Sequence, residues 1–124
     1  MDKNIKNSDT NTPISFFKDK VRRFVEDRNW KKYHTIKNLI QAIQIEAAEL
    51  SELFLFKELS VSEVLLNKEL LENVSDEIAD VFIYLLSLVN ELDLDLTNSF
   101  FNKMKKNRQK YPTKEFNNGN YYKK

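Results

Sequence analysis

The stretch TIKNLIQAIQIEAAELSELFLFK, residues 35–57, decides the fold class. Its apolar residues recur three and four positions apart, which is the period of an α-helix with one apolar face. Thr35 is placed to cap the amino end, because its side chain can accept a hydrogen bond from a free backbone N–H. The pattern therefore predicts a helix that follows Thr35 and runs to about Lys57. The apolar face comprises Ile36, Leu39, Ile40, Ile43, Ala47, Leu50, Leu53 and Phe54.

Three further segments show the same helical period, and each has capping residues at its amino end. Thr12 is the expected cap of the first, with Pro13 at its first helical position. Ser60 or Ser62 precedes the next helical element, and Asp95 or Thr97 caps the last. The first of these helices is expected from Pro13 to Arg28 or Asn29. The next begins between Glu63 and Leu70 and ends at Glu91 or Leu92, and it can be broken near Asn67. The last is expected from Leu96 to Lys110, before Pro112.

No segment alternates in the way a strand does, so the predicted fold class is all-α. The simplest architecture is a subunit of the four-helix-bundle type, completed by oligomerisation. Residues 1–124 are expected to form one domain. Its core covers about 13–112, and flexible tails cover 1–11 and 113–124.

The composition excludes several classes of chemistry. The chain has no Cys, one His and one Gly. It therefore lacks thiolate catalysis, a multi-His metal site within one subunit, and the glycine-rich loops that bind phosphates in many nucleotide enzymes. The net charge of +1 gives no general attraction to nucleic acid or to a membrane. No signal peptide or membrane span is recognisable, so we expect a cytoplasmic protein.

Carboxylates lie where a helix core is expected. Glu46 is only about 60° from the centre of the apolar face of residues 35–57, at about 100° per residue. Glu49 lies near the edge of that face, whereas Glu52 points away. In the third predicted helix Glu77 lies at the edge of the apolar face and Asp80 just beyond it. Because burying an unpaired carboxylate costs several kcal/mol of free energy, we expect these side chains to have a partner of opposite charge.

Two pairs of carboxylates facing each other would repel unless a cation held them together. Oxygen ligands without His or Cys suit Mg²⁺, Mn²⁺ or Ca²⁺. The alternative is that these acids are surface charges paired with Lys. A di-iron carboxylate site is excluded, because it needs a His three residues after a Glu on two helices, and His34 precedes the helix.

Three other features bear on partners and ligands, and the last two each allow two interpretations. The helix ending near Leu92 is apolar around nearly its whole circumference, which indicates a subunit interface. The basic run from Lys103 to Lys110 either complements the helix dipole or contacts phosphate. Trp30, Tyr33 and His34 either pack against helix ends or form a platform on which a base stacks.

Four stretches occur together: FVEDRNW at 24–30 with His34; Asn38-Leu with Glu46-x-x-Glu49-Leu-x-Glu52-Leu-Phe; Asp76-Glu77-x-x-Asp80-Val-x-x-Tyr84-Leu; and Lys103-Met-x-x-Asn107-Arg108-x-x-Tyr111-Pro112. With them, the chain resembles the all-α nucleoside triphosphate pyrophosphohydrolases of the MazG-like superfamily. It is most similar to the dCTP pyrophosphatase branch. The resemblance extends from about Phe16 to Pro112.

The resemblance implies a hydrolase that cleaves an NTP or dNTP between the α- and β-phosphates, giving the monophosphate and pyrophosphate. It implies a homodimer or homotetramer whose sites draw on more than one subunit. Phe56 stands where relatives often carry Trp, and Val21 where some carry His, so the preferred base stays open. The implied Mg²⁺ ligands are Glu46, Glu49, Glu77 and Asp80; the nucleoside contacts are Trp30, His34, Asn38, Phe56 and Tyr84; and the phosphate contacts are Lys103, Asn107, Arg108 and Tyr111.

The chemistry of the residues agrees with this reading. Either Glu46 or Glu49 could activate the attacking water, with Glu49 slightly preferred. The leading hypothesis is a Mg²⁺-dependent (Mn²⁺ is possible) pyrophosphohydrolase of dCTP or a modified pyrimidine dNTP. The alternatives are a broad-specificity NTP pyrophosphatase and a non-enzymatic helical interaction module. A nucleic-acid binder is disfavoured, because the basic residues concentrate at one helix end.

Overall fold

The computed structural model describes residues 5–124, and the first four residues of the predicted amino-terminal tail lie outside the described part. Residues 5–124 contain five α-helices, one short 3₁₀ turn and no strand, which confirms the all-α class. The chain forms two compact units, the first ending at Asp93 and the second comprising Leu94–Lys124. The elements are α1 (Ile14–Asp27), the turn η1 (Lys31–Tyr33), α2 (Ile36–Glu52), α3 (Val61–Leu66), α4 (Lys68–Glu91) and α5 (Leu96–Lys110).

Side-chain caps fix the starts of three helices as predicted. Thr35 Oγ1 accepts a hydrogen bond from the Asn38 N–H at 3.1 Å, at the start of α2. Asp95 accepts one from the Asn98 N–H at 2.9 Å, at the start of α5. Ser60 opens α3 with a reciprocal capping box. Each cap supplies an acceptor to an N–H that has no partner inside the helix.

The predicted cap of α1 is wrong by one residue. Pro13 is the N-cap, with extended backbone at φ −74° and ψ 158°, and it makes no side-chain cap hydrogen bond. The Thr12 hydroxyl donates instead to Asn11 Oδ1 at 2.7 Å. At the other end α1 stops at Asp27, close to the predicted end, and Asn29 takes a positive φ of 54°.

The predicted extent of the helix after Thr35 is also wrong, because α2 ends at Glu52 and not near Lys57. The backbone tightens there, and the N–H groups of Phe54 and Leu55 bond three residues back. Phe56 then adopts a left-handed φ of 59°. That conformation closes the turn that follows α2 and is unusual for a residue with a large side chain.

The third predicted helix is divided at Asn67 into α3 and α4, at the place where a break was expected. Asn67 has φ −98° and ψ 95°, which ends α3. Its side chain then accepts a hydrogen bond from the Leu70 N–H at 3.1 Å and caps α4. The asparagine thus acts at both ends of the break.

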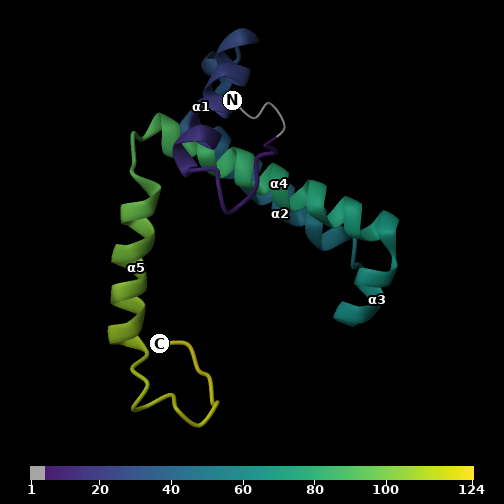
Figure 1. The fold of residues 1–124 in the computed structure, drawn as a ribbon, viewed down its shortest axis with the longest axis vertical. Coiled ribbons are helices and arrows are strands. Elements are labelled where there is room, and N and C mark those ends of the chain that lie inside the picture. Colours follow the sequence, from purple (N-terminus) through teal and green to yellow (C-terminus); the bar gives the residue numbers. More distant parts are fainter. Residues whose placement is uncertain (1–4) are drawn as a thin grey trace. The chain divides into compact units, whose positions relative to one another are not determined.

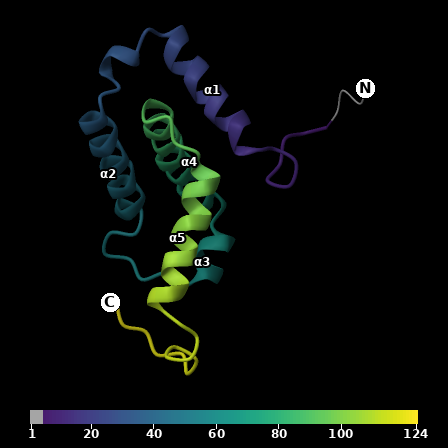
Figure 2. The ribbon, with the colours of Figure 1, turned by 90° about the vertical axis from the view of Figure 1, so that its left-hand side faces the viewer.

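In the first unit α4 is the central helix. Figures 1 and 2 show α2 running alongside it, and α1 and α3 also contact it. Val25 of α1, Leu39 of α2, and Leu86 and Val89 of α4 form the buried core. Asn90 adds a polar link, because its amide donates to a carbonyl of α1 at 3.0 Å.

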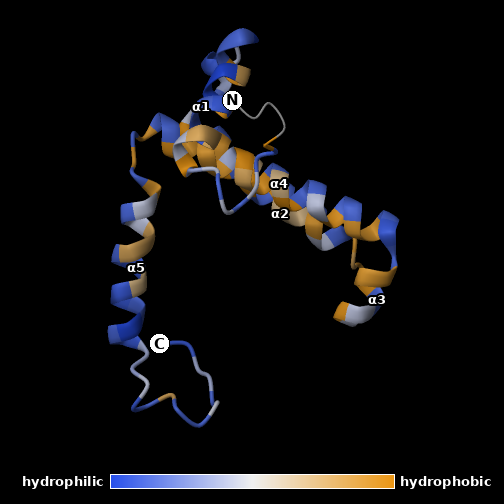
Figure 3. Ribbon diagram, viewed as in Figure 1, coloured by the Kyte–Doolittle hydropathy of each residue, from blue (hydrophilic) through white to orange (hydrophobic). Residues whose placement is uncertain are grey.

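The second unit consists of α5 and the chain that follows it. Figure 3 shows the carboxyl-terminal half of α5 coloured as hydrophilic. After the helix, the Tyr111 ring packs edge-on against Phe116 at 5.2 Å and stacks with Tyr121 at 6.3 Å. Lys124 forms an ion pair with Glu115 at 2.6 Å. Among residues 5–124, no helix has the length and apolar character needed to cross a membrane.

Candidate functional site

Three carboxylates from two neighbouring helices meet in the first unit. Glu46 comes from α2, and Glu77 and Asp80 come from α4, where a spacing of three residues places them on one face. One oxygen of each carboxylate lies within 4.8 Å of one oxygen of the other two. Because α2 and α4 lie against each other, they bring together acids that the sequence placed within or near two apolar faces.

Burial and mutual repulsion raise the pKa values of two acids in this group. Burial, followed by the neighbouring carboxyls of Glu49 and Asp80, raises the pKa of Glu46 from its ordinary 4.5 to about 7. Burial and then the Glu49 carboxylate also raise the pKa of Glu77. Glu49 is not one of the three acids within 4.8 Å, but it acts on two of them. The ionised form of the cluster is disfavoured because like charges lie together with little water.

Two oxygen atoms of the cluster have no hydrogen-bond partner. They are Glu46 Oε2 and Glu77 Oε2, and both are buried. Within the described residues, the ion pairs join other acids, so a pairing of these four carboxylates with Lys or Arg is not seen. Buried oxygens without donors, in a group of acids, fit a hard divalent cation such as Mg²⁺ or Mn²⁺.

An apolar cavity of about 340 Å³ lies between α1, the 3₁₀ turn and α4. Aromatic rings form much of its wall. Phe17 and Phe82 meet edge to face at 5.7 Å, and so do Phe24 and Trp30. Its volume and lining are those of a site for a small flat ligand. The lining residues are Phe17, Lys20, Val21, Phe24, Val25, Trp30, His34, Phe82, Ile83, Tyr84, Leu86 and Ser87.

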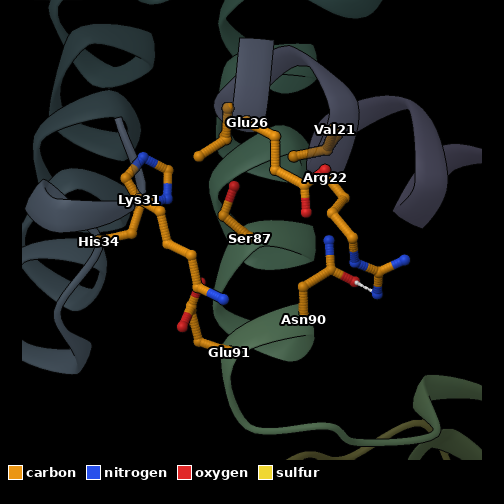
Figure 4. Close-up of a pocket in the computed structure, with 9 residues that line it drawn as sticks. Val21, Arg22, Glu26, Lys31, His34, Ser87, Asn90 and Glu91 are labelled. Atoms are coloured by element: carbon orange, nitrogen blue, oxygen red, sulfur yellow. Dashed lines mark hydrogen bonds between the residues drawn. The ribbon is translucent and has the colours of Figure 1, made fainter. Parts of the chain in front are cut away.

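A second, polar cavity of about 140 Å³ adjoins the first, and the two share four lining residues. Figure 4 shows Ser87 on α4 facing side chains of α1 and of the 3₁₀ turn. Both charge signs are present in its wall, which consists of Val21, Arg22, Val25, Glu26, Lys31, His34, Ser87, Asn90 and Glu91.

The structure brings three of the five predicted nucleoside contacts to the apolar cavity, namely Trp30, His34 and Tyr84. Asn38 does not line it; its side-chain amide donates to the Tyr33 carbonyl at 3.0 Å and so holds the 3₁₀ turn against α2. Phe56 is 98% exposed in the turn after α2 and does not line the cavity in its own chain.

The four predicted phosphate contacts all lie on or directly after α5, in the second unit. Lys103, Asn107 and Tyr111 are spaced by four residues and share a face of the helix. Arg108 lies in the last turn, where a cation is favourable. The Tyr111 hydroxyl accepts a hydrogen bond from the Lys124 N–H at 3.0 Å.

Sequence reasoning missed part of the cavity wall. Phe17 and Phe24 recur at helical spacing and are not among the predicted nucleoside contacts, although both line the cavity. Periodicity cannot separate the two cases, since a core face and a cavity wall are equally apolar. A signal for Ser87 does exist, because it is a hydroxyl within the apolar run Leu85 to Val89.

Several known proteins resemble this chain in sequence or in fold. A model of the MazG-like family matches residues 41–124. The chain is 33% identical over 90 residues to dCTP pyrophosphatase 1 of Rattus norvegicus, a match covering 72% of this chain and 53% of the relative. The human dCTP pyrophosphatase 1 is 32% identical over 90 residues, with the same coverage. The chain thus spans about half the length of the curated relatives it matches.

A crystal structure of a pyrophosphatase from Archaeoglobus fulgidus is similar in fold to most of this chain. It superposes with a TM-score of 0.74 at 38% sequence identity. The match covers 86% of this chain and 99% of that one. The likeness thus extends over nearly the full length of the archaeal chain.

Proposed function

The chain belongs to the MazG-like family, and from this premise we propose that it is a Mg²⁺-dependent nucleoside triphosphate pyrophosphohydrolase. The proposed substrate is dCTP or a modified pyrimidine dNTP, and the products are the monophosphate and pyrophosphate. The relatives named dCTP pyrophosphatase 1 and the archaeal pyrophosphatase support this reaction. The observation that carries the proposal is the carboxylate cluster with its two buried, unpartnered oxygens beside an aromatic cavity on the same helix.

Glu46, Glu49, Glu77 and Asp80 are the proposed ligands of the cation. A bound Mg²⁺ would neutralise triphosphate charge and lower the pKa of a bound water. Glu46, Glu77 and Asp80 already converge within 4.8 Å. Glu49 borders this group and is therefore the acid best placed to accept the proton of the attacking water, with Glu46 as the alternative.

The apolar cavity is the proposed nucleoside site. The Trp30 ring and the Tyr84 side chain offer surfaces against which a base can pack, and His34 offers a polar ring. Asn38 acts indirectly in this scheme, because its hydrogen bond to Tyr33 holds the turn that carries Trp30 and His34. On α5, we assign Lys103, Asn107, Arg108 and Tyr111 to the phosphates, since cationic and polar donors offset phosphate charge.

We also propose that the active form is a homodimer or homotetramer. Large apolar side chains stay exposed on α2 and α4 of the single chain, among them Ile40, Ile78 and Leu85. A second copy would remove such surface from water. Phe56 contacts a substrate only if such a copy presents it, because it does not line the cavity of its own chain.

Product analysis tests the function. The purified protein is incubated with Mg²⁺ and each common dNTP and NTP, the nucleotides are separated, and pyrophosphate is assayed directly. The expected products are a monophosphate and pyrophosphate, with a pyrimidine dNTP turned over fastest. Similar rates for all bases would replace the specific assignment by a broad-specificity pyrophosphatase. Release of inorganic phosphate with a diphosphate, or no turnover by a folded protein, would refute the proposal.

A further inference from the structure

The two cavities of the first unit meet at a buried serine. Ser87 is 4% exposed and is the one polar residue among those fully buried in the described chain. It lines both the apolar and the polar cavity. No side-chain hydrogen bond joins its hydroxyl to another described residue, and its oxygen is not among the fully enclosed unpartnered atoms, so the hydroxyl is open to cavity space. An unpartnered donor and acceptor therefore borders the proposed nucleoside site.

Ser87 is also in register with the carboxylates. Glu77, Asp80, Tyr84 and Ser87 follow at intervals of three, four and three residues on α4, so they lie along one face. Asp80 and Ser87 are two turns apart, which is roughly 10 Å at 1.5 Å per residue. This is the length scale of a nucleoside, so a nucleotide whose phosphates lie at the carboxylates would extend its base toward Ser87.

Ser87 has apolar neighbours on one side and polar neighbours on the other. On one side are the rings of the apolar cavity, which match the faces of a base. On the other side is the polar cavity, where Arg22 and Asn90 are already hydrogen-bonded to each other at 3.2 Å. Ser87 and His34 are the polar residues that the two cavities share, so the amino or keto groups of a base held in the apolar cavity would meet them there.

We propose that Ser87 is a specificity-determining residue, whose hydroxyl hydrogen-bonds the polar edge of a nucleobase held in the apolar cavity. The inference rests on the proposed function. It adds a physical basis for choosing between bases, because apolar contacts alone discriminate weakly, whereas a buried hydrogen-bonding group rejects a base that leaves it unpaired.

The test compares the wild type with Ser87→Ala, using Ser75→Ala as the matched control, an exposed serine on the same helix. Pyrophosphate release is measured with each common dNTP in the presence of Mg²⁺. Loss of one hydrogen bond is expected to raise KM for the preferred dNTP by about 3- to 10-fold with kcat nearly unchanged. KM for the poorly accepted dNTPs should stay the same, so the preference becomes flatter, and Ser75→Ala should behave as the wild type.

A binding measurement separates this inference from the proposed function. Trp30 is the single Trp of the chain and lines the apolar cavity, so its fluorescence reports binding of free deoxynucleosides without turnover. A preference for one nucleoside that Ser87→Ala abolishes supports the inference, even if the wild type hydrolyses no nucleotide and the proposed function fails. Turnover with the same base preference in Ser87→Ala overturns the inference alone. An equal rise of KM for every base would assign Ser87 a packing role and would also overturn it.

Discussion

Replacing Glu46 by Gln should stabilise the metal-free protein at neutral pH, although the residue lies in the proposed active site. In the folded state the pKa of Glu46 is about 7 against an ordinary 4.5. Between these values the folded chain keeps a proton that the unfolded chain has lost. Stability from this group is therefore complete below about pH 4.5 and falls as the pH rises through 7.

The size of the effect follows from the same values. A rise from 4.5 to about 7 would be worth about 3 kcal/mol if fully expressed. Water around this partly exposed side chain screens the charges, which reduces the expected effect to about 1–2 kcal/mol. For a domain of this size that corresponds to a change in Tm of about 5–10 °C.

The assay is thermal unfolding in a chelator at about pH 4.5 and about pH 7.5. The matched control is Glu52→Gln, which makes the same charge change on the same helix outside the cluster. The Tm of wild type and of the control should fall relative to Glu46→Gln as the pH rises. Adding Mg²⁺ at the higher pH should raise the Tm of the wild type and raise that of Glu46→Gln less. Parallel pH curves for wild type and Glu46→Gln, or an equal effect of Mg²⁺ on both, would refute the reasoning.

Three other predictions concern the site and the core. Asp80→Asn should lower kcat by about 10²- to 10³-fold, because one electrostatic stabiliser is lost. Pyrophosphate release is measured for this variant and for the control Glu72→Gln, which changes an exposed residue of α4. A rate for Asp80→Asn equal to that of the wild type would show that Asp80 is not part of the site. Trp30→Ala should raise KM about 5- to 100-fold through loss of base stacking, whereas Trp30→Phe should restore most of the affinity; a KM unaffected by the alanine would show that the base lies elsewhere. Asn38→Ala should lower the free energy of unfolding by about 1 kcal/mol in denaturant titrations, since one hydrogen bond is lost. The same variant should raise KM without changing kcat. An unchanged KM would show that the 3₁₀ turn holds its position without that bond.

Helix starts were predictable from the sequence, and helix ends were less so. Thr35, Ser60 and Asp95 each carry a side chain whose oxygen accepts from the first turn, which is a local signal. The end of α2 has no such signal, because Phe56 takes the left-handed position where Gly or Asn would be expected. Its apolar side chain prolongs the helical pattern beyond the helix itself.

The carboxylates and the cavity wall also differ in how far the sequence predicts them. Glu46 could be found because a charge within an apolar face is an exception that needs a partner. Phe17 and Phe24 in the cavity wall could not, because they satisfy the helical pattern whether a side chain or a ligand faces them. Only the packing of α1 and the 3₁₀ turn beside α4 leaves the space open. Sequence reasoning therefore finds the residues that break a pattern and misses those that obey it.

The packing of α2 against α4 brings together carboxylates that repel one another, so the stability of this helix pair depends on the charge of the carboxylates. Buried apolar contacts such as Leu39 of α2 and Leu86 of α4 hold the two helices side by side. The same contacts force Glu46 against Glu77 and Asp80, and repulsion between these acids opposes the packing. A divalent cation bound by these acids would remove that repulsion, and its binding energy would add to the stability of the α2–α4 pair. Because α4 is one continuous helix, the spacing from this cluster to Tyr84 and Ser87 is fixed by the helical rise. The distance from the carboxylates to the wall of the apolar cavity is therefore set by α4 itself.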